Sequence, residues 1–242
     1  MISRAREKKF IALFFLIIAI HLDSTFIGAR AELSVLFEDG FESGDFSAWS
    51  GISTSSGETA TVVDTLPHLG AYSAMFASDG GGGFEGAYSY VDVSSSSELY
   101  GRGYFRVSQS GIAENNDRFY FMRFRAGGVD VAYAGWRQTG GVTRWGLIIR
   151  DGTSWVTAFS GSAPSLDQWY CVELHWVEDS SSGFGELYVD GELVCSASGR
   201  NTAAFGGVDL VRFGLAEVYN CGPTTVYGDS FVLSDTYIGP ET

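Results

Sequence analysis

Arginine and aromatic side chains concentrate in one stretch of this sequence. Residues 102–150 hold eight arginines and three acidic residues, whereas the rest of the chain is strongly acidic. A guanidinium pairs with a carboxylate or sulfate through two parallel hydrogen bonds, and an indole offers a flat apolar face to a sugar ring. These residue types in one region predict binding of a carbohydrate, including an anionic one, through Trp136, Tyr133, Arg123, Arg125 and Arg144.

The same residues also have simpler interpretations. The arginines could pair with acidic residues of neighbouring strands and only balance the charge of a sheet. Tryptophan also fills cores, and Trp145 is expected there because it alternates with Leu147 and Ile149. Trp136 shares its face with Asp130 and is therefore the better prediction for an exposed ring.

One glutamate and one histidine are spaced for acid–base chemistry. Glu173 and His175 are two residues apart in a predicted strand, so their side chains share one face. They could abstract the proton α to a uronate carboxyl, which is lyase chemistry, if Arg123 and Arg125 converged with them in one cleft. A solvated strand face is the alternative, and the sequence leaves open whether the protein is an enzyme.

Acidic residues cluster where the chain following the leader begins. Glu38, Asp39, Glu42 and Asp45 supply the hard oxygen ligands that calcium prefers. Asp229 could join Asp39 if the first and last strands are neighbours. We expect the function to need no cofactor. The sequence leaves open whether the fold holds a structural calcium ion.

The first 31 residues have the pattern of an export signal. A basic start precedes an apolar run from Phe10 to Ile20, and Ala29-Arg30-Ala31 is typical of a cleavage site. The run is shorter than the roughly 20 apolar residues that span a bilayer, so no stable membrane anchor is expected after cleavage. We therefore predict a protein that is secreted and extracellular, or located in a periplasm or at a cell surface.

Charge and cysteine content narrow the class of protein further. The net charge of −14 argues against a nucleic-acid partner, because the surface would repel phosphates. Cys171, Cys195 and Cys221 form an odd set. In an oxidising compartment this set predicts one disulfide and one remaining thiol, with the pairing open.

Hydrophobic periodicity predicts the elements that position these residues. After the leader, apolar residues alternate with polar ones through most of the chain, and no segment of ten or more residues has helical spacing. Predicted strands include Arg118–Arg125, Val129–Trp136, Arg144–Arg150 and Trp169–Val177, and Asp190-Gly191 predicts a tight hairpin. Roughly fourteen short strands in one domain, residues 32–242, predict an all-β, two-sheet antiparallel jelly-roll sandwich.

Three segments carry a resemblance to a known superfamily. They are Trp169-Tyr170-Cys171-Val172-Glu173-Leu174, then Gly185-Glu186-Leu187-Tyr188-Val189-Asp190-Gly191, and a closing strand over Val232–Gly239. Together they resemble the concanavalin A-like lectin/glucanase superfamily, with LamG-like domains the most similar. The opening Phe37–Trp49 is similar to the start of many exported jelly-roll modules.

The resemblance implies a ligand class. It implies a secreted, non-catalytic module that binds a polysaccharide or cell-surface glycan. The paired carboxylates of the laminarinase-type branch, Glu-x-Asp-x-x-Glu, are missing from this chain. The alternatives are a structural or adhesive extracellular module, and a polysaccharide lyase or divergent glycosidase that uses Glu173 and His175.

Overall fold

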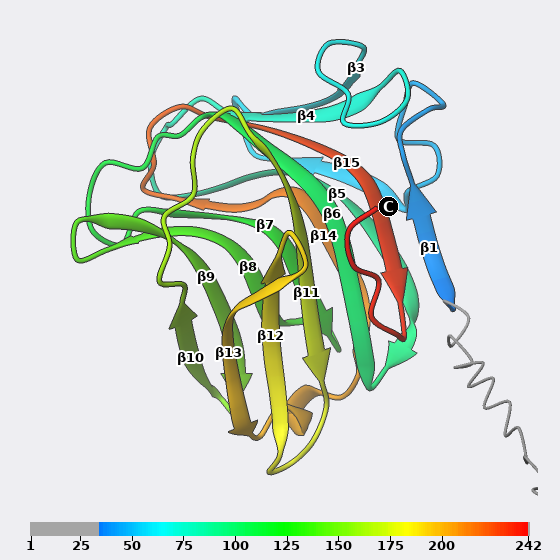
Figure 1. The fold of residues 1–242 in the computed structure, drawn as a ribbon, viewed down its shortest axis with the longest axis vertical. Helices are drawn as coiled ribbons and strands as arrows, with labels where there is room; N and C mark the ends of the chain where they lie inside the picture. Colours follow the sequence, from blue (N-terminus) through cyan, green and yellow to red (C-terminus); the bar gives the residue numbers. More distant parts are fainter. Residues whose placement is uncertain (1–33, 242) are drawn as a thin grey trace, which may run out of the picture. The chain divides into compact units, whose positions relative to one another are not determined.

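Two antiparallel β-sheets stack face to face in the computed structural model, which describes residues 34–241 (Figure 1). Sheet A runs in the order β13 (Glu192–Arg200), β12 (Gly183–Val189), β11 (Trp169–Val177), β6 (Glu98–Gln109), β15 (Thr224–Ser234), β4 (Ser73–Ser78) and β3 (Thr59–Val63), with β1 (Val35–Asp39) also paired to β15. Sheet B runs in the order β10 (Ser154–Phe159), β9 (Val142–Asp151), β8 (Val129–Thr139), β7 (Arg118–Ala126), β14 (Val208–Tyr219), β5 (Phe84–Ser96) and β2 (Gly51–Thr54).

The all-β prediction is confirmed. Among residues 34–241 the helical content is a single 3-10 turn, Ala203–Phe205, and no helix there is long and apolar enough to cross a membrane. The predicted signal peptide, residues 1–31, lies outside the described residues.

Local sequence signals placed several elements correctly. The three predicted arginine-bearing strands are β7, β8 and β9, and they are neighbours in sheet B. The predicted hairpin joins β12 to β13, where Asp190 and Gly191 have φ of 52° and 83°. Positive φ at both positions is what a type I′ turn requires.

Aromatic rings fill the space between the sheets. The Phe213 ring, from sheet B, lies with its centroid 4.7 Å from Phe105 and 4.7 Å from Phe231, both of sheet A. Gly103 and Gly228 make room for it, because a Cβ at either would come within 2.5 or 2.6 Å of that ring. Two glycines on neighbouring strands thus allow one large side chain to cross the interface between the sheets.

The cysteines correct the expectation of a disulfide. Cys171, Cys195 and Cys221 are all free. Cys171 alternates with core-facing Val172 and so projects from the outer side of sheet A, whereas Cys195 pairs across the ladder with the fully buried Leu187 and faces inward. Cys221 lies beyond the end of β14, and its thiol donates to the carbonyl of Arg118. Cys171 and Cys195 thus point away from each other, which explains why they do not pair.

Candidate functional site

The outer face of sheet B gathers most of the side chains predicted to contact a glycan. Arg123 and Arg125 of β7 project from the face opposite to the buried Phe124, and Tyr133 pairs directly with Arg123. Arg144 of β9 lies opposite Arg137 on β8. We call this surface the arginine face; it carries Arg118, Arg123, Arg125, Arg137, Arg144, Arg150 and Arg212 with Tyr120, Tyr133, Asp130 and Glu217.

Two carboxylates neutralise the central part of the arginine face. Glu217 accepts hydrogen bonds from Arg118, at 3.3 Å, and from Arg123. Asp130 lies 3.4 Å from the Arg123 guanidinium and 2.9 Å from that of Arg125. Here the simpler interpretation, that arginines pair with acids of neighbouring strands, is correct.

The remaining arginines of this face have no carboxylate within ion-pair distance among residues 34–241. They contact other groups: Arg137 donates to the Asn116 amide oxygen at 2.8 Å, and Arg144 donates to the Ser160 carbonyl at 3.0 Å. Arg137 and Arg144 are also directly opposite each other in the ladder. Like charges in this position repel, so a bound anion would relieve an unfavourable arrangement.

A hollow of about 320 Å³ is lined by Arg137 and Arg118. Its walls include two exposed rings, Phe84 at 69% exposure and Trp155 at 41%. Tyr120 and Tyr133 also line it, and the Tyr120 hydroxyl is buried without a hydrogen-bond partner. Burial raises the pKa of Tyr120 well above its ordinary value, so the phenol is neutral.

Trp155 belongs to a packed aromatic group. Its ring stands edge-on to Tyr133, with centroids 5.2 Å apart, and the Arg150 guanidinium lies 3.8 Å from its centroid. The stacked arginine holds the indole in place on the edge strand β10. This ring therefore offers a preformed flat surface beside the hollow.

Two further hollows extend the first one across sheet B. The second shares Phe84 and Glu217 with the first and is lined also by Arg123 and Arg212. The third shares Arg212 with the second and reaches β2, at the other edge of the sheet. The three hollows are neighbours that together extend from β10 to β2, across the width that an extended polymer would cover.

Trp136 is not part of this face, which corrects the prediction of an exposed ring. Its side chain is 3% exposed and packs edge-on against Trp145, with centroids 5.7 Å apart. Trp145 is buried, as predicted. The cause is an extra residue in β8, where Val131 and Ala132 are both fully buried and the alternation slips by one relative to Asp130.

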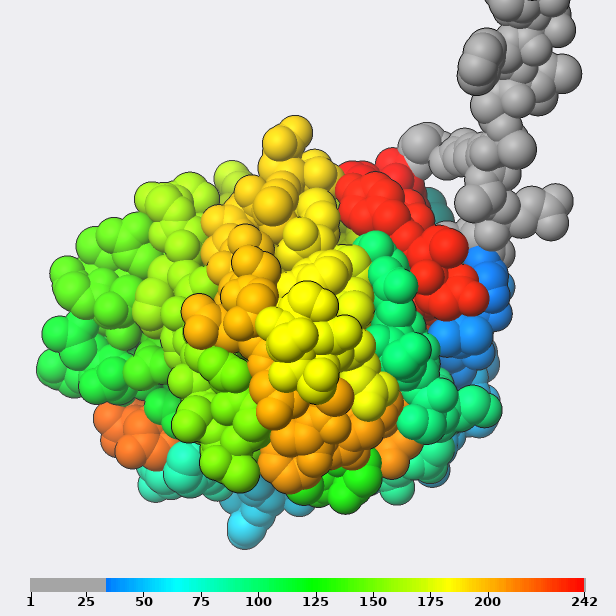
Figure 2. Space-filling model, turned by 90° about the horizontal axis from the view of Figure 1, so that it is seen from below, coloured from blue at the N-terminus to red at the C-terminus, as the bar shows by residue number. Residues whose placement is uncertain are grey.

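Glu173 and His175 lie on the opposite surface, the outer face of sheet A. The Glu173 carboxylate accepts the N–H groups of Ile238 and Gly239, at 2.9 and 2.8 Å, and burial raises its pKa. His175 lies 3.0 Å from both Glu98 and Glu186. The C-terminal segment, red in Figure 2, lies beside the yellow strand β12.

This arrangement does not meet the condition that the lyase alternative required, namely that these two residues converge with the arginines. Glu173 and His175 are 1% and 4% exposed, and the whole sandwich separates them from Arg123 and Arg125. The Glu173 carboxylate holds the C-terminal segment on sheet A through its two hydrogen bonds. A lyase that used all four residues in one cleft is therefore incompatible with the fold.

The two predicted calcium ligands lie close to each other in the fold. β1 pairs with β15, and Asp39 is opposite Phe231, two residues from Asp229. Both carboxylates already accept protein donors: Asp39 binds Trp49 Nε1 at 2.7 Å, and Asp229 binds the N–H of His68 at 2.8 Å. Calcium binding by this pair stays a prediction.

Comparison with known proteins identifies solved structures that have a similar fold. No protein-family model matches the chain, and no curated protein matches it. Among solved structures, the cellulose-induced protein Cip1 is similar at 19% identity with a TM-score of 0.64, over 85% of this chain and 100% of that one. An endo-β-1,4-glucuronan lyase from the fungus Trichoderma reesei is similar at 16% identity with a TM-score of 0.66, over 84% and 96%. The binding domain of botulinum neurotoxin serotype C1 is similar at 9% identity with a TM-score of 0.51, over 77% and 44%.

These likenesses support the fold class, a two-sheet antiparallel jelly-roll sandwich. They cover nearly the whole of the first two structures, so the described unit corresponds to their complete fold.

Several residues of the site were not assigned to it by sequence reasoning. Phe84, Tyr120, Arg137, Trp155 and Glu217 all line the first hollow. Tyr120, Arg137 and Trp155 lie in or beside the arginine-rich and aromatic-rich stretch, so the sequence indicated their region without assigning them individually. Phe84 follows a run of glycines and gave no comparable signal.

Proposed function

We propose that the arginine face binds a polysaccharide whose sugar residues carry carboxylates, and that it does so without chemistry. The observation that carries this proposal is that Arg137 and the exposed indole of Trp155 line one hollow, with Arg144 directly opposite Arg137 in the ladder and no carboxylate of residues 34–241 within ion-pair distance of either arginine. A uronate fits both features, because its carboxylate pairs with a guanidinium while its ring stacks on an indole.

The shape of the face supports a polymer rather than a single sugar. The row of hollows crosses sheet B, and each hollow has at least one arginine in its lining. Two of the similar solved structures are a cellulose-induced protein and an endo-β-1,4-glucuronan lyase. We also expect the domain to be exported, on the N-terminal sequence, and to need no cofactor for binding.

Binding to immobilised polyglucuronate, with a neutral β-glucan as the matched ligand, tests the proposal. We expect selective binding to polyglucuronate that weakens at raised salt. Arg137→Gln should weaken it about tenfold or more, because a hydrogen bond to a charged group is worth roughly 1.5–3 kcal/mol. Arg106→Gln is the control, since Arg106 lies on sheet A and pairs with Asp167 at 2.9 Å. Equal affinity for both polymers would refute the proposal.

A second candidate, a uronan lyase, is favoured by Tyr120. Its unpartnered hydroxyl lies in a hollow lined by Arg118 and Arg137, where a carboxylate would be neutralised. In β-elimination the Glu217 carboxylate, which lines the same hollow, would take the C5 proton, the C4–C5 double bond would form as the C4–O bond breaks, and the neutral Tyr120 phenol would protonate the departing O4, leaving an unsaturated uronate. New ultraviolet absorbance from polyglucuronate, abolished in Tyr120→Phe, would establish this activity. Binding with no new absorbance would leave the non-catalytic function.

A further inference from the structure

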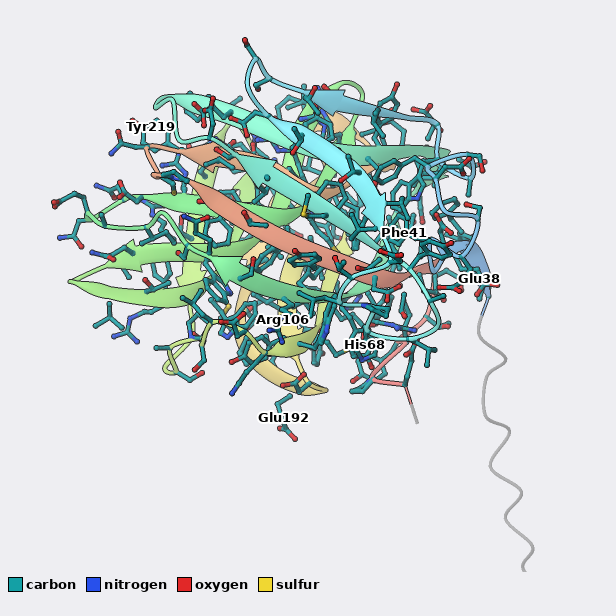
Figure 3. The ribbon with its side chains drawn as sticks, turned by 90° about the horizontal axis from the view of Figure 1, so that it is seen from above. Glu38, Phe41, His68, Arg106, Glu192 and Tyr219 are labelled. Carbon is teal, nitrogen blue, oxygen red and sulfur yellow. The ribbon has the colours of Figure 1, made fainter. Side chains whose placement is uncertain are left out.

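Three carboxylates from separate segments meet at one end of the sandwich. Glu58 precedes β3, Asp79 follows β4, and Glu85 is in β5, and each offers an oxygen within 4.8 Å of the others. This end lies near Tyr219, which pairs with Phe84 in the ladder. Figure 3 shows Tyr219 at the opposite end from Glu38, so the cluster is far from the predicted pair Asp39 and Asp229.

Glu58 is the unusual member of this cluster. The residue is 7% exposed, and both of its carboxylate oxygens are buried without any hydrogen-bond partner. A buried carboxylate with no partner is strongly unfavourable, and native proteins rarely tolerate one. Its oxygens are directed at Asp79 and Glu85, which are themselves acidic.

No cationic side chain compensates this charge. Among residues 34–241, none of the three carboxylates lies within ion-pair distance of an arginine or histidine. Their protein contacts are neutral: Asp79 accepts the N–H of Gly81 at 3.0 Å, and Glu85 accepts the Ser78 hydroxyl at 2.8 Å. The cluster therefore has the charge of a cation site, and no cationic side chain of residues 34–241 neutralises it.

Glycines surround the cluster and keep side chains out of it. Gly57 has φ of 94°, and a Cβ there would lie 2.2 Å from Asp79 Oδ2. A Cβ at Gly81 would lie 2.9 Å from Glu85 Oε1. A larger residue at either position would occupy the space beside the carboxylate oxygens of Asp79 and Glu85, so the two glycines keep that space free.

Electrostatics makes the cluster unfavourable without a counter-charge. Three carboxylates with oxygens within 4.8 Å of one another repel, and the burial of Glu58 weakens the screening of its charge by water. A cation bound between them would neutralise this charge.

We propose that Glu58, Asp79 and Glu85 bind one calcium ion. The ligand set is oxygen only, without histidine or cysteine, which favours a hard cation over zinc or copper. Two of the ligands lie on or beside a glycine-rich loop, which suits the flexible coordination of calcium better than the strict octahedron of magnesium. The ion would join β3 and β4 of sheet A to β5 of sheet B, and its ligand Glu85 also lines the second hollow of the arginine face.

Calorimetric titration of the chelator-treated full chain with calcium chloride tests this site. We expect one calcium ion per chain, with affinity reduced at least tenfold in both Glu58→Gln and Asp79→Asn. Glu192→Gln, which changes an exposed glutamate of β13, should bind like the unchanged protein. Asp229→Asn separates this site from the other predicted one and should also retain binding.

Thermal unfolding gives a second readout. Calcium at 100 times its Kd should raise the Tm by about 5–10 °C, and magnesium should raise it less. In chelator, Glu58→Gln should have a Tm equal to or above that of the unchanged protein, because the amide removes a buried charge; this shows that the variant folds. Absence of calcium binding, or binding that Glu58→Gln and Asp79→Asn leave unchanged, overturns the proposal.

Discussion

Replacing Trp155 with alanine tests whether the exposed indole contacts the polysaccharide. The residue is 41% exposed, so of a side chain that buries up to about 250 Å² roughly 100 Å² is free for a ligand to cover. At about 25 cal/mol per Å², covering half to all of this area contributes about 1–2.5 kcal/mol. We therefore expect Trp155→Ala to weaken binding of polyglucuronate by about 5- to 70-fold.

Titration calorimetry with soluble polyglucuronate oligosaccharides measures this change. Stability should alter little, because Trp155 lies on the edge strand β10 and is not in the core. Leu193→Ala is the matched control, since Leu193 is 50% exposed but lies on β13 of sheet A. If Trp155→Ala stays folded and changes the Kd less than twofold, the ring does not contact the ligand and the proposed position of the polysaccharide is wrong.

Three further predictions concern stability. In chelator, the Tm should fall as pH rises from about 5 to 8, because the pKa of Glu58 is raised from 4.5 to about 7 in the folded state. The stabilising proton on Glu58 is fully present below pH 4.5 and is lost as the pH rises through about 7. Scanning fluorimetry of Glu58→Gln should show no pH dependence of the Tm from this group. Gly214→Ala should cost more than about 2 kcal/mol in urea unfolding, since Gly214 has φ of 116° and its Cβ would lie 2.6 Å from the Phe76 ring; an unchanged midpoint would contradict this. Ending the chain after Thr236 removes both N–H groups that donate to the buried Glu173 carboxylate, and it should lower the Tm by about 5–10 °C. A Tm within 1 or 2 °C of that of the full chain would show that the carboxylate finds other partners.

Local patterns in the sequence determined the elements themselves. Strands β7 to β9 were predictable because their inward positions are apolar and adjacent strands follow one another closely along the chain. The hairpin at Asp190-Gly191 was predictable because positive φ at two successive positions strongly restricts residue choice. These inferences need only neighbouring residues.

Irregularities within strands defeated the same reasoning. In β8 the extra residue at Val131 shifts the alternation, so Asp130 is on the outer face while Trp136 is in the core. Strict period-two alternation cannot reveal a bulge, because the bulge depends on the partner strand. The prediction for Trp136 failed for this reason.

The sequence by itself determined the all-β class, the sandwich and the concentration of arginines on successive strands. Only the tertiary structure decided which residues meet. Glu217 pairs with Arg123 because β14 lies beside β7, although the two residues are 94 positions apart. Glu173 and the arginines are kept apart because they project from outer faces of different sheets. Strand order and the stacking of sheets arise from contacts between distant segments, and no local pattern encodes which outer face a strand will present.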